Sequence, residues 1–327
     1  MGTTRRVVLA GGSGFLGRSL APVLEARGYQ VVILTRSPSP GDAREVAWDG
    51  RTPGGWCAQL EGAVAVVNLA GRSVDCRYTP ENRREILSSR LDSVRVLGEA
   101  LRQCATPPSV WVQAASLAIY GNSGEAVRDE SSPPGEGFSV DVCRQWERAF
   151  AEQHSPGTRQ VLLRIGFALG RDGGALGPLA RLARWGLGGT VGSGKQYVSW
   201  LHLDDLNALF LRAIEHPSMQ GVYNATGPSP VTNAELMRTL RHVLRRPWSP
   251  PVPAWAVRVG ARLLGTEAEL ALSGRRGLPR RLMAEGFQFR HTDLSEALED
   301  LLGTRHTPAA ATSASGGRGA PCDPYPS

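Results

Sequence analysis

Short apolar runs alternate with longer amphipathic stretches along the first half of the chain. The runs are rich in Val, Leu, Ile and Ala and are apolar on both faces of an extended strand, which is typical of a parallel sheet covered on both sides. Six such runs occur, at residues 6–10, 29–35, 44–49, 63–70, 109–116 and 159–169. The pattern predicts an α/β fold with a doubly wound parallel sheet and helices on both of its faces.

Helical spacing fills several of the intervals between these runs. The predicted helices span residues 15–27, 80–104 and 138–150. In the third helix, large apolar residues recur every four positions, which places them on one face. These residues are Phe138, Val142, Trp146 and Phe150. The helix therefore has a clear packing face, and its other positions are free for chemistry.

The second half of the chain is richer in glycine and has a different organisation. Two further amphipathic helices are predicted, at 231–244 and 292–302. The last residues are mostly Ala, Ser, Thr, Gly and Pro, with little to bury. We expect a first domain over 1–170, a smaller C-terminal substrate lobe that returns strands to the sheet over 171–302, and a disordered tail over 303–327.

The composition narrows the class of protein. The 327 residues are 41% hydrophobic and 20% charged, an ordinary globular balance. The five cysteines form no CxxC pair and the six histidines form no HxxxH pair, so neither a disulfide framework nor a metal site is predicted. Four glycines within residues 11–17 interrupt the first apolar run and argue against a signal peptide. No apolar run approaches the roughly 20 residues of a membrane span, so we expect a cytoplasmic protein without a membrane partner.

The formal net charge of +7 is concentrated in one segment. Residues 241–290 contain ten arginines and three glutamates, so this segment alone carries the whole excess. It lacks a basic stripe interleaved with aromatic residues and any known nucleic-acid-binding motif, so we expect no nucleic-acid partner. A solvated surface and a pocket for an anionic ligand are the two alternatives that remain open.

The strongest motif is the glycine-rich stretch between the first run and the first helix. Gly11, Gly14 and Gly17 have the spacing GxxGxxG, which in this context is typical of a dinucleotide site. The first glycine allows the tight turn, the second lets the backbone approach a diphosphate, and the third lets helix and strand pack closely. The predicted contacts with the cofactor are Gly11, Gly12, Ser13, Gly14, Phe15, Leu16 and Gly17.

The residues after the second run indicate which cofactor is bound. An acidic residue is expected there if the ribose 2′-hydroxyl is to be recognised, but Thr35 and Arg36 occupy the place. An arginine suits a 2′-phosphate because its guanidinium donates charge-assisted hydrogen bonds. The sequence therefore predicts NADP rather than NAD, with Thr35 and Arg36 among the binding residues.

Several motifs together resemble the extended short-chain dehydrogenase/reductase superfamily, and more closely its epimerase-family branch often labelled cell-division-inhibitor-like. They include "AGGSGFLG", "LTR", "VVNLAG", "LRIGFALGRDGGAL" and "GLGGTVGSGKQYVSWLHLDDL", and the resemblance covers residues 5–302. It implies an NADP-binding Rossmann domain and an oxidoreductase or epimerase acting on a small molecule. The resemblance also implies further cofactor contacts at Leu69, Ala70, Gly71, Glu85, Arg90 and Ala168.

The superfamily's catalytic pair is missing from this chain. Its members use Tyr-x-x-x-Lys on a helix, where the lysine lowers the pKa of the tyrosine. Alignment on Glu147 places these two positions at Ser139 and Cys143, and no Tyr-x-x-x-Lys occurs anywhere in the sequence. Ser116 falls at the superfamily's serine position, and Tyr120 follows it closely. These two residues are the candidates for a proton relay; strand-end packing and turn formation are the alternative interpretation.

Two other motifs resemble ligand-binding sites but are interpreted as structural. "GTVGSGK" is followed by Gln196 where a nucleotide triphosphate loop needs Ser or Thr, and the following residues are strand-like. "HLDDL" could hold a metal, but we expect Asp204 and Asp205 to cap a helix that starts at Leu206. Two functions then remain: an NADPH-dependent reductase or epimerase of altered mechanism, and a non-catalytic NADPH-binding protein that signals redox state to a partner.

Overall fold

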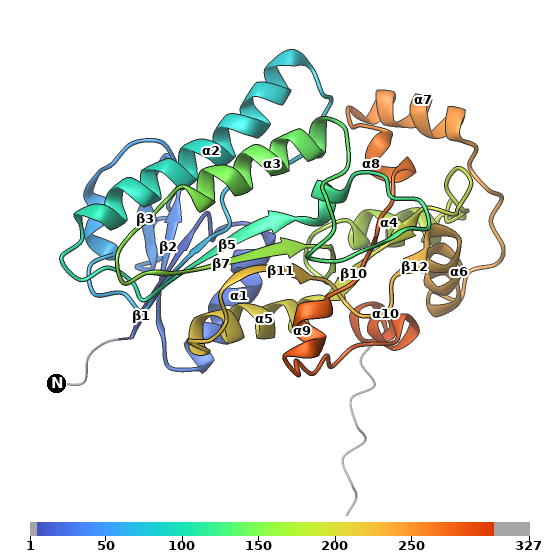
Figure 1. The fold of residues 1–327 in the computed structure, drawn as a ribbon. Coiled ribbons are helices and arrows are strands. Elements are labelled where there is room, and N and C mark those ends of the chain that lie inside the picture. Colours follow the sequence, from blue (N-terminus) through green and yellow to red (C-terminus); the bar gives the residue numbers. More distant parts are fainter. Residues whose placement is uncertain (1–4, 304–327) are drawn as a thin grey trace, which may run out of the picture.

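The computed structural model describes residues 5–303, and its centre is a parallel sheet of seven strands (Figure 1). The order across the sheet is β11-β7-β5-β4-β1-β2-β3, so the chain moves outward from β1 in one direction and then crosses to the other side at β4. The strands are β1 (Arg6–Ala10), β2 (Gln30–Thr35), β3 (Glu45–Ala47), β4 (Ala65–Asn68), β5 (Val110–Ser116), β7 (Arg159–Ile165) and β11 (Gly221–Ala225). The predicted doubly wound α/β fold is confirmed.

Helices cover both faces of this sheet (Figure 1). One face carries α1 (Phe15–Ala26) and α5 (Leu203–Glu215), which contact each other, and the other carries α2 (Pro80–Gln103) and α3 (Phe138–Ala151). Each layer has its own apolar core. Leu24 and Phe210 are fully buried in the first, and the Trp111 and Phe150 rings meet edge to face at 5.0 Å in the second. The burial of both faces explains why the strands lack hydrophobic–polar alternation.

The sixth apolar run, residues 159–169, was predicted as one strand but forms two. It divides at Gly166 into β7 and a short strand β8 (Phe167–Leu169), which leaves the main sheet and pairs with β10 (Trp200–His202). A side chain at Gly166 would overlap the carbonyl oxygen of Ser199. The glycine therefore lets two backbone segments meet where the chain leaves the sheet.

The C-terminal part of the chain builds a smaller layer beyond the carboxyl ends of the strands (Figure 1). Three helices, α4 (Leu176–Arg184), α6 (Asn233–Val243) and α10 (Leu294–Leu302), bury Trp200, Met237 and Leu298 in one cluster. The remaining elements are β6 (Val127–Arg128), β9 (Tyr197–Val198), β12 (Val231–Thr232), β13 (Arg276–Gly277), α7 (Ala254–Leu264), α8 (Glu269–Leu272), α9 (Arg280–Ala284) and the 3-10 turns η1 (Gly55–Gln59) and η2 (Leu117–Tyr120). β13 pairs with β6, so the segment around Arg276 is fastened to the segment that follows η2.

Side chains form hydrogen bonds with the backbone of β11, the strand at one edge of the sheet. Arg281 donates to the carbonyl oxygen of Val222 at 2.7 Å, and the Glu130 carboxylate accepts the amide of Asn224 at 3.0 Å. β11 was not among the six predicted runs, although strands returning to the sheet were expected. Because Arg281 and Glu130 come from different segments, the edge is held by tertiary contacts.

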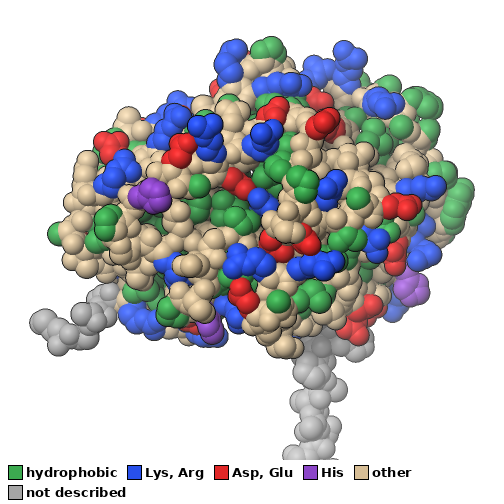
Figure 2. All heavy atoms as spheres, in the orientation of Figure 1, with side chains coloured by type: hydrophobic (Ala, Val, Ile, Leu, Met, Phe, Trp, Pro, Cys, Tyr) green, Lys and Arg blue, Asp and Glu red, His purple; other side chains and the backbone are tan. Residues whose placement is uncertain are grey.

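The surface mixes charge types on the face shown in Figure 2, where Lys and Arg side chains are interspersed with Asp and Glu. Hydrophobic side chains also reach the surface near α7, among them Trp255 and Leu263, which are 68% and 84% exposed. Within residues 5–303, no helix has the length and apolar character needed to cross a membrane. The predicted tail lies outside the described residues, apart from Gly303, and cytoplasmic localisation stays a prediction.

Candidate functional site

The glycine loop lies where the chain turns from the carboxyl end of β1 into α1, beside the point at which the strand order changes direction. Gly11 has a φ of 76°, and a side chain there would lie 2.8 Å from Cα of Ala70. A side chain at Gly17 would overlap the Gly12 carbonyl oxygen. In contrast, the nearest atom to a Cβ on Gly14 would be 3.8 Å away. Gly11 and Gly17 therefore allow backbone contacts that a side chain would block, whereas the space beside Gly14 is open to a ligand.

The first turn of α1 is free to bind an anion. Gly14 is the N-cap and offers no side-chain cap, and no acidic residue occurs in the first turn. The amides there have no intrahelical partners, and the helix dipole favours negative charge at this end. Arg18 brings a positive charge to the loop, because its guanidinium donates to the Ser13 carbonyl oxygen at 3.0 Å. Arg18 was not singled out in the sequence, although it lies one residue after the motif.

Thr35 and Arg36 lie at the end of β2, next to the loop. The Thr35 hydroxyl is buried and hydrogen-bonded to the Ser13 hydroxyl at 3.0 Å, so Thr35 fixes the loop. Arg36 is exposed, and no carboxylate of the described chain lies within ion-pairing distance of it. Its guanidinium is available to a ligand phosphate at this side of the loop.

A buried polar network shapes the neighbouring turn after β4. Asn68 donates to Ser93 Oγ at 3.2 Å and to Gln113 Oε1 at 3.0 Å, and its own Oδ1 accepts the Ala70 amide at 3.0 Å. All three side chains are fully buried. The network therefore holds the backbone of Leu69, Ala70 and Gly71 against the glycine loop. Asn68 was visible in the sequence as the polar residue of "VVNLAG", but its structural task was not recognised.

Glu85 and Arg90, both on α2, have different surroundings. Glu85 is paired with Arg72 on the preceding loop. The Arg90 guanidinium lies over the Trp146 ring, 5.1 Å from its centre, and donates to the carbonyl oxygen of Ile86 at 2.8 Å. A side chain at Gly71 would lie 3.2 Å from the guanidinium carbon of Arg90. Arg90 thus lies at the turn expected to line the cofactor, and the contacts of both residues with a cofactor stay predictions.

The far end of the candidate site is formed by Phe15 and the loop after β8. A side chain at Gly170 would lie 2.6 Å from the Phe15 ring, and Gly173 contacts the same ring. One residue further on, Gly174 lies against both Phe15 and the Ala168 carbonyl oxygen. Leu16 and Ala168 are partly buried against the α1–α5 core. The structure therefore brings Phe15 and Ala168 together although 153 positions separate them in the sequence.

The two candidate relay residues differ in their freedom. Ser116 ends β5, is half-buried, and accepts the Ala118 amide at 3.1 Å as the cap of η2. Tyr120 is 1% exposed, and its hydroxyl lies 2.7 Å from the Asp129 carbonyl oxygen and 2.9 Å from Asn224 Oδ1. Burial raises the pKa of Tyr120 above its ordinary value. These contacts occupy the Tyr120 hydroxyl, whereas the Ser116 hydroxyl retains its proton for another acceptor.

The Tyr120 hydroxyl is part of a larger buried network. It accepts a hydrogen bond from Arg164 on β7 at 2.8 Å, and the same guanidinium pairs with both carboxylate oxygens of Glu147 on α3, at 2.8 and 2.9 Å. The network joins sheet, helix and turn. Its geometry favours a structural role for Tyr120, and the predicted role in proton transfer stays untested.

The superfamily's tyrosine and lysine positions lie on α3, facing η2. Ser139 is half-buried in the first turn, and Cys143 is buried against Leu117 and Ile119. Burial raises the pKa of the Cys143 thiol to about 12. The thiol is therefore neutral near pH 7 and is neither a nucleophile nor a replacement for the lysine charge.

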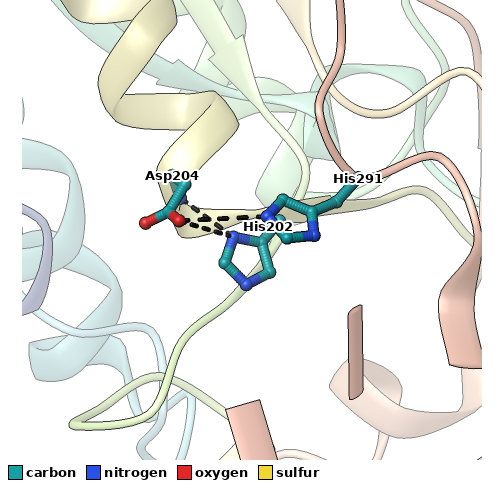
Figure 3. Close-up of side chains that lie close together, drawn as sticks. All are labelled: His202, Asp204 and His291. Carbon is teal, nitrogen blue, oxygen red and sulfur yellow. Dashed lines mark hydrogen bonds and ion pairs between the residues drawn. The ribbon is translucent and has the colours of Figure 1, made fainter. Parts of the chain in front are cut away.

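A second polar cluster lies at the start of α5 (Figure 3). The His202 and His291 rings are stacked with centres 3.7 Å apart, and Asp204 Oδ2 lies 3.9 Å from His202 Nδ1 and 3.8 Å from His291 Nε2. His202 Nδ1 accepts the Asp204 amide, so α5 begins at Leu203 and not at Leu206 as expected. Asp205 accepts the amides of Arg290 and His291.

This cluster does not fit a metal centre. The lone pair of His202 Nδ1 accepts the Asp204 amide. The two imidazole rings are stacked and nearly parallel, so their in-plane lone pairs do not point toward each other. A tetrahedral ion needs lone pairs that converge on one point. The cluster instead caps α5 and fastens the segment around His291 to it.

Comparison with known proteins identifies the family. The model of the NAD-dependent epimerase/dehydratase family matches residues 7–226, and a domain of unknown function, DUF1731, matches residues 252–301. The chain is 37% identical to the Bos taurus "Epimerase family protein SDR39U1" over 303 residues, which cover 91% of this chain and 99% of the relative. An Arabidopsis thaliana relative, named as a chloroplastic homolog of the same protein, is also 37% identical, with 90% of this chain and 86% of the relative covered.

Solved structures give the same assignment. The human epimerase family protein SDR39U1, crystallised with NADPH, superposes with a TM-score of 0.82 at 35% identity, covering 90% of this chain and 98% of that one. A nucleoside-diphosphate sugar epimerase from Corynebacterium glutamicum superposes with a TM-score of 0.74 at 30% identity, covering 92% of this chain and 59% of that one. The resemblance inferred from the motifs is confirmed, and the chain belongs to the NAD-dependent epimerase/dehydratase family.

Proposed function

We propose that this chain binds NADPH along the carboxyl edge of its sheet and acts as a reductase or epimerase on a small molecule without a Tyr-x-x-x-Lys pair. The observation that carries the proposal is the glycine loop, which is open at Gly14 and leads into an uncapped helix. Exposed Arg36 beside the loop supports the phosphorylated cofactor. The NADPH in the human relative supports the same choice.

The residues present fit such a cofactor. The loop over 11–17 would hold the diphosphate with free amides, and Arg36 would bind the 2′-phosphate. Leu69, Ala70 and Gly71 would line the adenosine side, and Phe15 with Ala168 the nicotinamide side. When bound, NADPH supplies a hydride to an electrophilic carbon.

Ser116 is the proposed hydrogen-bond donor to the substrate oxygen. Its hydroxyl accepts one backbone amide and so keeps its proton for a ligand at the end of β5. Tyr120 would support this role from behind, because it anchors η2 through Arg164 and Asn224. A Ser116→Ala variant that turns over substrate as fast as the wild type would contradict the assignment.

A non-catalytic NADPH-binding protein that reports redox state to a partner is the second candidate function. The observation that favours it is the neutral, buried thiol of Cys143 at the lysine position. NADPH oxidation measured across small carbonyl compounds and nucleotide sugars separates the two functions, since a sensor oxidises NADPH with none of them.

The binding site itself is tested by Gly14→Val. Gly14 has a φ of −80° and open space around its Cβ position, so valine leaves the fold intact and occupies the place of the diphosphate. We expect NADPH affinity to fall by more than about 100-fold, because a branched side chain excludes the ligand. Gly55→Val, in η1 and also in open space, is the control. An unchanged NADPH affinity in Gly14→Val, with an unchanged melting temperature, would contradict the proposed site.

A further inference from the structure

The segment around β13 crosses the carboxyl edge of the sheet next to η2. A side chain at Gly277 would lie 3.2 Å from Cδ1 of Leu117, the residue after Ser116. The Ser199 hydroxyl donates to the Arg275 carbonyl oxygen and accepts the Gly277 amide, both at 2.8 Å. The Arg275 amide donates to the Tyr197 carbonyl oxygen at 3.0 Å. These bonds fix the backbone of Arg275 close to the end of β5.

The Arg275 side chain is half-buried, and no carboxylate in the described part of the chain forms an ion pair with it. Of the four arginines in residues 275–281, the other three have partners: Arg276 lies over the Tyr197 ring, and Arg280 and Arg281 pair with carboxylates. No hydrogen bond or ion pair to the Arg275 guanidinium occurs within residues 5–303. The Arg275 guanidinium is therefore free to pair with a bound anion.

A second guanidinium faces the same place. Burial lowers the pKa of both Arg275 and Arg90. Cys143 and Tyr78 lie close enough to both guanidinium groups to raise the pKa of each in part. Glu269 also acts on Arg275, but it is exposed and no ion pair joins them. The Cys143 thiol is neutral near pH 7. Two positive groups therefore approach Cys143, and the α3 carboxylate one turn away, Glu147, is already paired with Arg164.

Tyr78 reaches this position from the loop before α2. Its ring meets Phe138 edge to face, with centres 5.0 Å apart, and its hydroxyl is buried without a hydrogen-bonding partner. The Tyr78 amide donates to the Glu267 carboxylate at 2.6 Å, which fixes the loop. Burial raises the pKa of Tyr78, and the nearby Ser139 hydroxyl partly offsets this, although no bond of ordinary geometry joins the two. A phenol from another segment therefore lies beside the position from which the superfamily's tyrosine is missing.

We propose that Arg275 and Tyr78 form a substrate subsite for a small anionic carbonyl compound. Arg275, with Arg90 beside it, binds the carboxylate or phosphate of the compound, and the Tyr78 hydroxyl donates a hydrogen bond to its carbonyl oxygen. The inference rests on the proposed NADPH-dependent function and names the substrate class.

Titration of the full chain, saturated with NADPH, with oxalate and with inorganic phosphate tests the subsite. Oxalate presents a carboxylate beside a second oxygen, and phosphate presents the alternative anion. We expect at least one of them to saturate the wild type in calorimetry, with the tighter one identifying the substrate's charged group. Arg275→Met should weaken that binding at least tenfold, the effect of losing a charge-assisted bond. Arg276→Met, the neighbouring arginine on an aromatic ring, is the matched control and should change it less than twofold.

Two further variants sharpen the result. Arg275→Lys keeps the charge and should recover part of the affinity, which separates a lost contact from a disturbed fold. Tyr78→Phe should weaken oxalate binding severalfold, whereas Tyr197→Phe should not. The inference is overturned if neither anion binds the wild type, or if Arg275→Met and Arg276→Met weaken binding equally. Failure of NADPH to bind would instead refute the proposed function, and the same titration on NADPH-free protein would then decide the subsite separately.

Discussion

The glycine loop and helix α3 border the same edge of the sheet, yet they follow the family pattern to different degrees. At the loop, the requirements are set by backbone: Gly17 must pass close to Gly12, and Gly14 must leave room. On α3, the tyrosine and lysine positions hold Ser139 and Cys143. Cofactor binding by backbone amides depends on the turn itself, so its residues cannot move to another segment. A function made by a side-chain tip can be supplied from another segment, as we propose for Tyr78.

The largest effect is expected at the pair that anchors α3. In Glu147→Gln, the Arg164 guanidinium is left buried without its counter-charge, and we expect the free energy of unfolding to fall by about 3 to 5 kcal/mol. Urea denaturation measures the change. Glu152→Gln removes a carboxylate from the exposed pair with Arg148 on the same helix and should cost less than about 1 kcal/mol. Equal effects of the two variants would show that α3 is not anchored by this pair.

The next effect concerns the loop. Arg36→Ala should reduce NADPH affinity about tenfold or more and leave NADH affinity unchanged, since a charge-assisted bond contributes roughly 1.5–3 kcal/mol. Fluorescence titration with both cofactors measures it. Arg44→Ala, a nearby arginine already paired with Asp42 and Glu25, is the control. Equal affinity of the wild type for the two cofactors would rule out recognition of the 2′-phosphate.

A smaller, pH-dependent effect is expected at the start of α5, where His202 is the N-cap. Burial and the neighbouring His291 lower the pKa of His202, with Asp204, Asp300 and Asp205 acting in the opposite direction. The unfolded chain then takes up a proton near pH 6.5 that the folded chain takes up only at lower pH. The free energy of unfolding should therefore fall as the pH drops below about 6.5, by at most about 1.4 kcal/mol per pH unit. In His202→Asn this slope should be flatter; a slope identical to that of the wild type would exclude His202 as its source.

The smallest effects should come from the former catalytic positions. Ser139→Ala and Cys143→Ala should each change turnover of any substrate found by the NADPH oxidation panel less than about threefold, because neither group supplies a proton or a charge. Tyr120→Phe should be more damaging, since it removes the hydroxyl that is bonded to Arg164 and Asn224. Loss of activity in Cys143→Ala with NADPH binding retained would place the chemistry back on α3.

The parts of the fold that follow from local pattern were predictable from the sequence. Runs buried on both faces gave the order of strand and helix, and the loop motif placed the cofactor end of the site. Gly166 was not recognisable as a break, because the requirement comes from Ser199, 33 positions later. β11 is short and carries Tyr223 and Asn224, so its sequence is too polar to stand out as a buried strand.

The candidate chemistry was less predictable for a physical reason. The search for a tyrosine and lysine assumed that both lie on one helix, whereas Tyr78 reaches α3 from a loop whose position is fixed by Glu267. Such a contact leaves no periodic signal in either segment. Arg275 was included only in the general observation of a basic segment, because the lack of a partner for its guanidinium is a property of the folded chain.

The side-chain bonds along β11 have a consequence for how this protein behaves when crowded. A parallel sheet ends in a strand whose outward amides and carbonyl groups can recruit a strand from another molecule. Here the Val222 carbonyl oxygen and the Asn224 amide are already bonded to Arg281 and Glu130, so a foreign strand would have to displace both side chains first. The same bonds that close the fold thus act as a guard against edge-to-edge polymerisation at this margin of the sheet.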